Sequence, residues 1–267
     1  MLRIGYYQFR PQFGQIQENL KQVLNALKDV SADLIVLPEL AFTGYYFKDR
    51  EETRTLAEDP QDSSTIESLV ALCRDKDFYL ITGFAEKQQD KVFNSSLLIG
   101  PEGVIHTYRK LHLFSEEKNW FDPGDIPLQV WEVREANVGM MVCFDWIFPE
   151  VTRTLTVEGA DIICHPSNLV LDYCQQTMLS RCLENGVFAV TANRYGADKR
   201  PHGELRFTGK SQIVAPKGEL LHRSKSQKQE VFITEIDPIL ARDKHITPLN
   251  QIISDRRPEF YAPLSQV

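Results

Sequence analysis

The feature of this chain that most constrains its fold is a regular alternation between short apolar runs and helical patterns. The runs LRIGYYQF (2–9) and DLIVLPE (33–39) are bounded by turn residues and predict buried strands. Between them, the segment 16–29 repeats its apolar residues at helical spacing. Strands that alternate with helices in this way are typical of an α/β protein.

The alternation continues to residue 237 without a Gly/Ser linker, an internal repeat or a low-complexity segment. Further helices are predicted at 64–75, 149–160 and 173–186, and further strands at 78–86, 93–100, 104–110, 138–142, 161–166, 187–194, 209–223 and 230–237. Ser64 and Glu67 stand at the spacing of a capping box, and Gly186 is typical of a helix end. We therefore expect one domain over residues 1–267.

Composition narrows the class of partner. With 267 residues and 42% hydrophobic content, the chain can bury a substantial core. Its formal net charge of -7 does not suit a nucleic-acid binder, and no apolar run approaches the roughly 20 residues of a membrane span. The five cysteines are odd in number and form no CxxC pair, so neither a disulfide framework nor a structural zinc site is expected. We predict a cytoplasmic protein that binds a small molecule.

Three charged residues follow apolar segments, where α/β proteins commonly hold their sites. Apolar and aromatic neighbours predict a confined, low-dielectric setting for Glu39, which suits a general base, although a carboxylate exposed at a helix start is the alternative. Lys110 is equally explained as a lysine that carries its ammonium to the surface. Glu117, taken alone, is better explained as a solvated loop charge, and Glu116 could take its place.

Cys143 has the most informative surroundings. The apolar run VGMMV ends just before it, and Pro149 can begin a helix soon afterwards. This order is similar to that of a nucleophile elbow, in which the backbone N–H of the next residue, here Phe144, helps to hold an oxyanion. The other four cysteines are better explained as buried core thiols.

Five segments together indicate a family. LPELAFTGY, YRKLHLF…E…FDPG, GMMVCFDWIFPE, RCLENGVFAVTANR and DRRPEFY follow one another over nearly the whole chain. They closely resemble the nitrilase superfamily of carbon–nitrogen hydrolases. The resemblance implies that the family's glutamate, lysine and cysteine triad falls on Glu39, Lys110 and Cys143. It also implies that an additional family glutamate falls on Glu117.

The same resemblance implies a more specific fold than the pattern of elements does. That fold is a four-layer αββα sandwich with two mixed β-sheets, paired with further subunits in a homodimer or larger homo-oligomer. No metal and no organic cofactor is expected. Arg181, Glu184 and Asn193 lie in segments that resemble the family framework, so we assign them structural roles.

The implied reaction is hydrolysis of a non-peptide C–N bond in a small amide or carbamoyl compound, which yields a carboxylic acid and ammonia. A free thiol is only slightly ionised at neutral pH, so its attack requires a nearby base or cation. We expect Glu39 to take the proton of Cys143, and Lys110 with the Phe144 N–H to hold the oxyanion. Water then hydrolyses the thioester, while Glu117 orients Lys110.

The residues predicted to bind substrate are Phe144, Trp146 and Asn168. Family members that hydrolyse carboxylate-bearing substrates often have arginine just after the nucleophile, where this chain has apolar residues over 146–148. We therefore expect neutral or cationic acyl groups to be preferred, unless an arginine such as Arg194 or Arg206 reaches the pocket from elsewhere.

Three alternatives remain open at this point. A nitrile could follow the same route through a thioimidate. A cysteine–histidine acyl hydrolase would use His112 or His165 as its base. A catalytically idle protein could keep the fold as a scaffold, although the presence of Glu39, Lys110 and Cys143 together argues against it.

Overall fold

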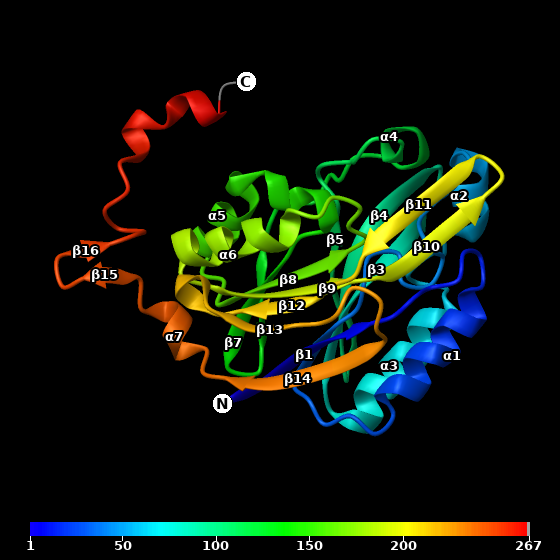
Figure 1. The fold of residues 1–267 in the computed structure, drawn as a ribbon, viewed down its shortest axis with the longest axis horizontal. Helices are drawn as coiled ribbons and strands as arrows, with labels where there is room; N and C mark the ends of the chain where they lie inside the picture. The colour runs from blue at the N-terminus through cyan, green and yellow to red at the C-terminus, as the bar shows by residue number, and fades with distance from the viewer. Residues whose placement is uncertain (266–267) are drawn as a thin grey trace.

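Two six-stranded sheets form the centre of the computed structural model, which describes residues 1–265 (Figure 1). The first sheet has the order β14 (Glu230–Ile236), β1 (Leu2–Gln8), β2 (Leu34–Val36), β3 (Tyr79–Gln88), β4 (Lys91–Gly100) and β5 (Gly103–Arg109). The second has the order β13 (Leu220–Arg223), β12 (Gln212–Val214), β9 (Phe188–Asn193), β8 (Ile162–Ser167), β7 (Ala136–Met140) and β6 (Val130–Val133). Each sheet has three parallel strands flanked by antiparallel ones, so both are mixed.

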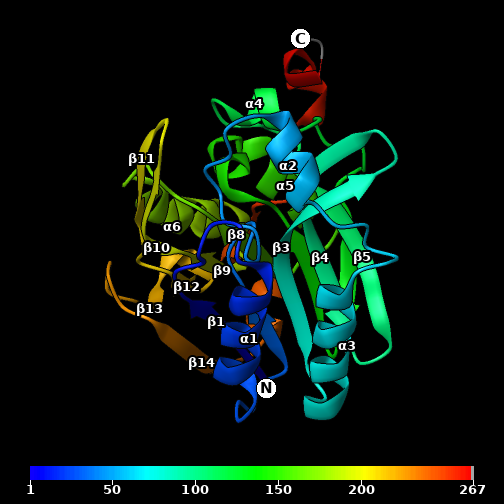
Figure 2. The ribbon, with the colours of Figure 1, turned by 90° about the vertical axis from the view of Figure 1, so that its right-hand side faces the viewer.

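The sheets pack face to face, and a helix pair covers the outer side of each. β1, β2 and β3 contact β8 and β9 across the interface. The helices α1 (Ile16–Leu27) and α3 (Ser64–Lys76) cover the first sheet, whereas α5 (Pro149–Val157) and α6 (Cys174–Asn185) cover the second. Figures 1 and 2 show the two pairs on opposite sides of the sheets. This order of layers confirms the predicted αββα sandwich.

The remaining elements are short. The helical ones are α2 (Arg50–Leu56), α4 (Glu117–Trp120), α7 (Ile239–Arg242), η1 (Cys143–Ile147), η2 (Pro216–Gly218), η3 (Pro258–Phe260) and η4 (Ala262–Ser265). Two hairpins are formed by β10 (Tyr195–Arg200) with β11 (Gly203–Thr208), and by β15 (His245–Thr247) with β16 (Asn250–Gln251). Beyond α7 the chain leaves the body as a C-terminal tail (Figure 1). No helix within residues 1–265 has the length and apolar character needed to cross a bilayer.

Several predicted boundaries need correction. The cap of α3 is Ser63 rather than Ser64, because the Ser63 hydroxyl accepts a hydrogen bond from Ile66 N at 3.1 Å. The strand expected over 209–223 is two strands, since the turn at Pro216–Gly218 separates β12 from β13. Gly186, in contrast, ends α6 in the left-handed conformation, as predicted.

Candidate active site

The candidate site lies where several strands end together. Glu39 follows β2, Lys110 follows β5, Cys143 follows β7 and Asn168 follows β8. The Asn168 side chain donates to the backbone oxygen of Glu39 at 2.8 Å, which joins the two sheets at this edge. Residues far apart in the sequence therefore meet at the carboxyl ends of strands from both sheets, and sites at strand ends are common in α/β proteins.

Lys110 lies between two buried carboxylates. Its Nζ is 2.7 Å from Glu39 Oε1 and 2.8 Å from both Oε1 and Oε2 of Glu117. Glu117 is further held by the Tyr45 hydroxyl, which donates to Oε1 at 2.6 Å, and by Phe114 N, which donates to Oε2 at 3.1 Å. Both oxygens of Glu117 are thus occupied by fixed donors.

The interpretation of Glu117 as a solvated loop charge is wrong. Glu117 begins α4 and is fully buried, together with Trp120 three residues later on the same side of the turn. Glu116 is exposed, so it does not take the place of Glu117 in this cluster. Trp120 packs into the interior, and Glu117 is buried on the same face of α4.

Among the described residues, the carboxylate of Glu39 is hydrogen-bonded through one of its two oxygens. Its Oε1 accepts hydrogen bonds from Lys110 Nζ and from Asn94 Nδ2, each at 2.7 Å, whereas its buried Oε2 has no hydrogen-bond partner among the described residues. The backbone here is tightly constrained, because Leu40 has a φ of 48° and a Cβ added at Gly83 would lie 2.3 Å from the Cα of Glu39.

Cys143 stands on a strained turn. β7 ends at Met140, two residues before the predicted strand end at 142, and Cys143 begins η1 with a φ of 43°. Positive φ is uncommon for a residue other than glycine and is the backbone state of a sharp strand-to-helix turn. The Asp145 carboxylate stabilises this turn by accepting from Val142 N at 2.9 Å. The first hydrogen bond of η1 runs from Asp145 N to Val142 O, so the helix itself leaves the Phe144 N–H unpaired.

Burial and the charges in this cluster determine the protonation states of Cys143 and Lys110. Burial and the neighbouring Glu39 carboxylate raise the pKa of the Cys143 thiol well above its ordinary value, although Lys110 opposes this. Burial alone would lower the pKa of Lys110, but the carboxylates of Glu117 and Glu39 outweigh it and raise that pKa. The site therefore holds a neutral thiol beside a charged ammonium.

The rings of the two candidate histidines form their hydrogen bonds with groups other than the Cys143 thiol. His165 Nε2 lies 2.9 Å from the backbone oxygen of Cys143, and its Nδ1 lies 3.2 Å from Thr191 Oγ1. Burial lowers the pKa of His165 to about 4, so the ring is neutral at physiological pH and donates from Nε2. His112 Nδ1 lies 2.8 Å from Asp145 Oδ1. Both rings thus support the backbone around the nucleophile turn.

A small pocket opens over the thiol. Its cavity volume is only about 10 Å³, and its lining residues are Phe114, Cys143, Phe144, Trp146, Asn168, Leu169, Val170 and Leu171. The three residues predicted to bind substrate are all among them. Neither arginine proposed as an outside contributor lines this pocket: Arg194 is buried in an ion pair with Asp198, and Arg206 is exposed and pairs with Glu204.

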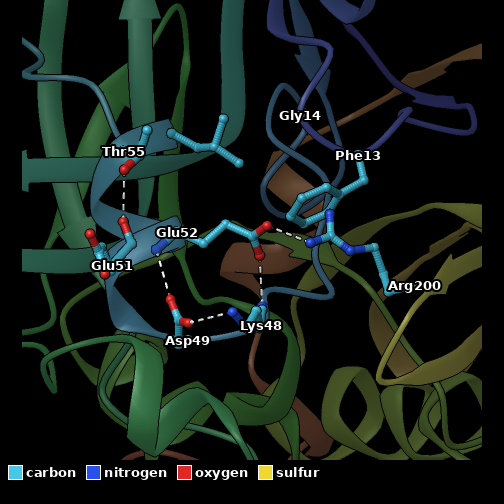
Figure 3. A pocket seen from close by; sticks show the side chains of 9 residues that line it. Phe13, Gly14, Lys48, Asp49, Glu51, Glu52, Thr55 and Arg200 are labelled. Carbon is cyan, nitrogen blue, oxygen red and sulfur yellow. Dashed lines mark hydrogen bonds and ion pairs between the residues drawn. The ribbon is translucent and has the colours of Figure 1, made fainter.

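A second, more open pocket lies beside α2 (Figure 3). There the Arg200 guanidinium lies 3.7 Å from the centre of the Phe13 ring and pairs with Glu52. The other carboxylate oxygen of Glu52 accepts from Lys48 N at 2.7 Å. These contacts fasten the β10–β11 hairpin to α2, so we interpret them as structural.

Three residues of the site were missed by the sequence analysis: Asn94, Tyr45 and Asp145. Asn94 gives the clearest signal, because it is a polar residue within the apolar strand segment FNSSLLIG and therefore needs a partner when buried. The pattern around Tyr45 gives no comparable signal. Within residues 1–265, no group of three His, Cys, Asp or Glu side chains is arranged to hold a metal ion.

Fold, site and sequence comparison agree on one class of protein. The chain belongs to the carbon–nitrogen hydrolase family, whose pattern it matches over residues 3–244. It is 43% identical to a nitrilase from Pyrococcus abyssi (strain GE5 / Orsay), over 98% of this chain and 99% of that protein. It is 32% identical to an (R)-stereoselective amidase from Pseudomonas sp., over 90% of this chain and 87% of the relative. A carbon–nitrogen hydrolase structure from Helicobacter pylori G27 superposes with a TM-score of 0.89 at 24% identity, covering 99% of this chain and 98% of that one.

Proposed function

We propose that the protein hydrolyses the C–N bond of a small amide or carbamoyl compound through a thioester on Cys143. The observation that carries this proposal is the unpartnered oxygen of Glu39. Of the two carboxylates on Lys110, Glu117 has both oxygens hydrogen-bonded, whereas Glu39 Oε2 has no partner among the described residues. A buried carboxylate with one free oxygen is suited to accept a proton from a nearby neutral thiol.

In the proposed first half-reaction, proton transfer accompanies attack. Glu39 Oε2 takes the proton of Cys143 as the sulfur bonds to the substrate carbonyl carbon, because the resting thiol is not ionised. Lys110 has three N–H donors, and the two carboxylates engage two of them. The third, with the Phe144 N–H, is left for the oxyanion. Glu39 then gives its proton to the leaving nitrogen, and ammonia departs.

The second half-reaction uses the same groups in reverse. Glu39, again ionised, takes a proton from water as the water oxygen attacks the thioester carbon. The C–S bond breaks, the carboxylic acid leaves, and the sulfur recovers a proton from Glu39. Glu117 keeps Lys110 in place throughout, because Tyr45 and Phe114 fix its two oxygens.

We propose amides rather than nitriles as the preferred substrates. The relatives support either choice, since one is named a nitrilase and another an amidase. The two substrate classes use the same nucleophile and base, and a nitrile would form a thioimidate instead of the tetrahedral oxyanion. Ammonia release from short aliphatic amides, carbamoyl compounds and nitriles of matched chain length tests this directly. A higher kcat/KM for the nitrile than for its amide would reverse the assignment.

The competing function is a scaffold without catalysis, and one variant separates it from the proposal. Cys143→Ala should abolish ammonia release while the protein keeps its melting temperature within a few degrees, because only one sulfur atom is removed. A wild-type protein that releases no ammonia from any of these substrate classes would favour the scaffold.

We also propose that the protein acts in the cytoplasm as a homodimer or larger homo-oligomer. Exposed apolar side chains lie on α5, α6 and the C-terminal tail, among them Val157, Leu183, Leu249 and Phe260. A second copy that covers them would remove this apolar surface from water. All five cysteines are free thiols, which suits a reducing compartment. Light scattering after gel filtration should give the mass of two or more chains; the mass of one chain would contradict the assembly.

A further inference from the structure

One buried amide contacts both charged partners of the nucleophile. Asn94 lies on β4 and is 1% exposed. Its side-chain Nδ2 donates to Glu39 Oε1 at 2.7 Å, and its backbone oxygen accepts a hydrogen bond from Lys110 N at 2.8 Å. A single residue of the first sheet is therefore fixed to the base by its side chain and to the lysine by its backbone.

We propose that Asn94 is the positioning residue that selects which oxygen of Glu39 acts as the base. Asn94 and Lys110 together occupy Oε1, so the plane of the carboxylate is fixed and Oε2 is left as the proton acceptor. This inference rests on the proposed function, in which Glu39 deprotonates Cys143. Asn94 does not line the pocket over the thiol, so we place its role in holding Glu39.

The other end of the same amide supports a functional role. Among the described residues, the buried Oδ1 of Asn94 has no hydrogen-bond partner. An unsatisfied buried acceptor lowers stability, so the Oδ1 of Asn94 does not explain why an amide stands at this position. The N–H donated to Glu39 accounts for the presence of an amide at this buried position.

Asn185 offers a matched control at the end of α6. It is also fully buried, its Nδ2 donates to the backbone oxygen of Arg181 at 2.9 Å, and its Oδ1 likewise has no partner among residues 1–265. Replacement of either asparagine by leucine therefore removes one buried amide of the same kind. Only the replacement at Asn94 removes a hydrogen bond to Glu39.

The test compares Asn94→Leu and Asn185→Leu in steady-state amide hydrolysis across a range of pH. For Asn94→Leu we expect kcat to fall roughly 10- to 100-fold, because a misplaced general base loses part of the 10²- to 10⁴-fold effect that such groups supply. KM should change by less than about twofold, since uniform substrate binding is untouched. The acid limb of the pH–rate profile should move to higher pH, because the ionised carboxylate has lost a donor. Asn185→Leu should keep the wild-type kcat and acid limb.

A kcat and acid limb in Asn94→Leu equal to those of Asn185→Leu would overturn the inference. Asn94→Ala repeats the comparison without the added bulk, and failure of both variants to fold would also overturn it, by showing a structural role. Glu39→Gln separates the two levels of the proposal. An inactive Glu39→Gln with an unaffected Asn94→Leu overturns only the role of Asn94, whereas a fully active Glu39→Gln overturns the proposed function as well.

Discussion

At the scale of single residues, the charged side chains of the site are shielded from water. Glu39, Lys110 and Glu117 are almost wholly buried, so each depends on the others for its charge to be tolerated. Burial and, after it, the neighbouring Glu39 carboxylate raise the pKa of the Cys143 thiol well above its ordinary value, so the resting thiol is protonated. In the proposed reaction, Glu39 takes the proton of this thiol as the sulfur attacks the substrate.

Lys110→Arg tests how strictly this cluster depends on geometry. We expect it to lower kcat nearly as much as Lys110→Ala, by at least about 100-fold, because a planar guanidinium is too wide for a space fitted to one ammonium between two carboxylates. Steady-state ammonia release for both variants checks this. An arginine variant with near-normal kcat would reduce Lys110 to a general source of positive charge.

Alkylation should distinguish Cys143 from the other cysteines. All five thiols are buried, and Cys143 lines the pocket described above. Burial raises the pKa of Cys73 to about 12 and that of Cys182 still further, and neither has a base beside it. Peptide mass mapping after brief iodoacetamide treatment of the folded protein should find Cys143 labelled first. Equal labelling of all five would contradict the assignment.

The sequence predicted these residues unevenly, for physical reasons. Glu39, Lys110 and Cys143 stand beside apolar strand segments and in family motifs, so they could be found before the structure was known. Glu117 lies in a polar stretch, and its burial depends on the packing of α4, which local composition does not reveal. The contact of Asn94 with Glu39 joins residues 55 positions apart, and nothing in either segment specifies that pairing.

At the scale of elements, the nucleophile turn depends on the neighbouring strand. His165 on β8 donates to the Cys143 carbonyl oxygen and so supports a backbone with positive φ. This contact affects how the activity of a His165 variant is interpreted. Loss of turnover in His165→Ala does not by itself indicate a cysteine–histidine mechanism, because the variant also releases the turn that carries the thiol.

His165 gives a pH dependence of stability whose sign can be stated. Burial lowers its pKa from 6.5 to about 4 in the folded protein. Below pH 6.5 the unfolded chain therefore gains a proton that the folded chain does not, and the free energy of unfolding falls until pH reaches about 4. This contribution amounts to about 3 kcal/mol at 1.36 kcal/mol per pKa unit. Urea unfolding at pH 7 and pH 4.5 should show a smaller loss of stability for His165→Gln than for the wild type.

An equal loss of stability in wild type and in His165→Gln would show that His165 does not titrate with a lowered pKa.

Elements were predicted where apolar periodicity was strong. The central strands and the four covering helices follow that periodicity closely. The β10–β11 hairpin has the segments YGADKR and GELRFT, which are mostly polar and lack a regular alternation. Its position depends instead on the ion pair of Arg194 with Asp198 and on the contact of Arg200 with Phe13, which are tertiary.

At the scale of the whole molecule, the two facing sheets leave a small apolar pocket over the nucleophile. Its lining includes no charged side chain, so a carboxylate on the acyl group would be buried without a partner. We expect kcat/KM for a short aliphatic amide to exceed that for its ω-carboxylate analogue of equal length by at least about 30-fold, since an unpaired charge costs several kcal/mol. A preference for the carboxylate would require an arginine to enter the pocket when substrate binds.

The four-layer architecture was beyond what periodicity alone could predict. Alternating strands and helices indicate only an α/β protein, because they do not determine whether the strands form one sheet or two. The resemblance to the nitrilase superfamily predicted two sheets, and the structure has them. We propose that residues 1–267 fold as one domain, since the core between the sheets receives residues from both halves of the chain.

The central claim is that Cys143 becomes covalently acylated during turnover. The most direct measurement is mass spectrometry of enzyme mixed with a short aliphatic amide and quenched in acid within one turnover. We predict a mass increase equal to the acyl group, located on the peptide that contains Cys143 and absent from Cys143→Ala. Ammonia release without any adduct, or an adduct on another residue, would contradict it.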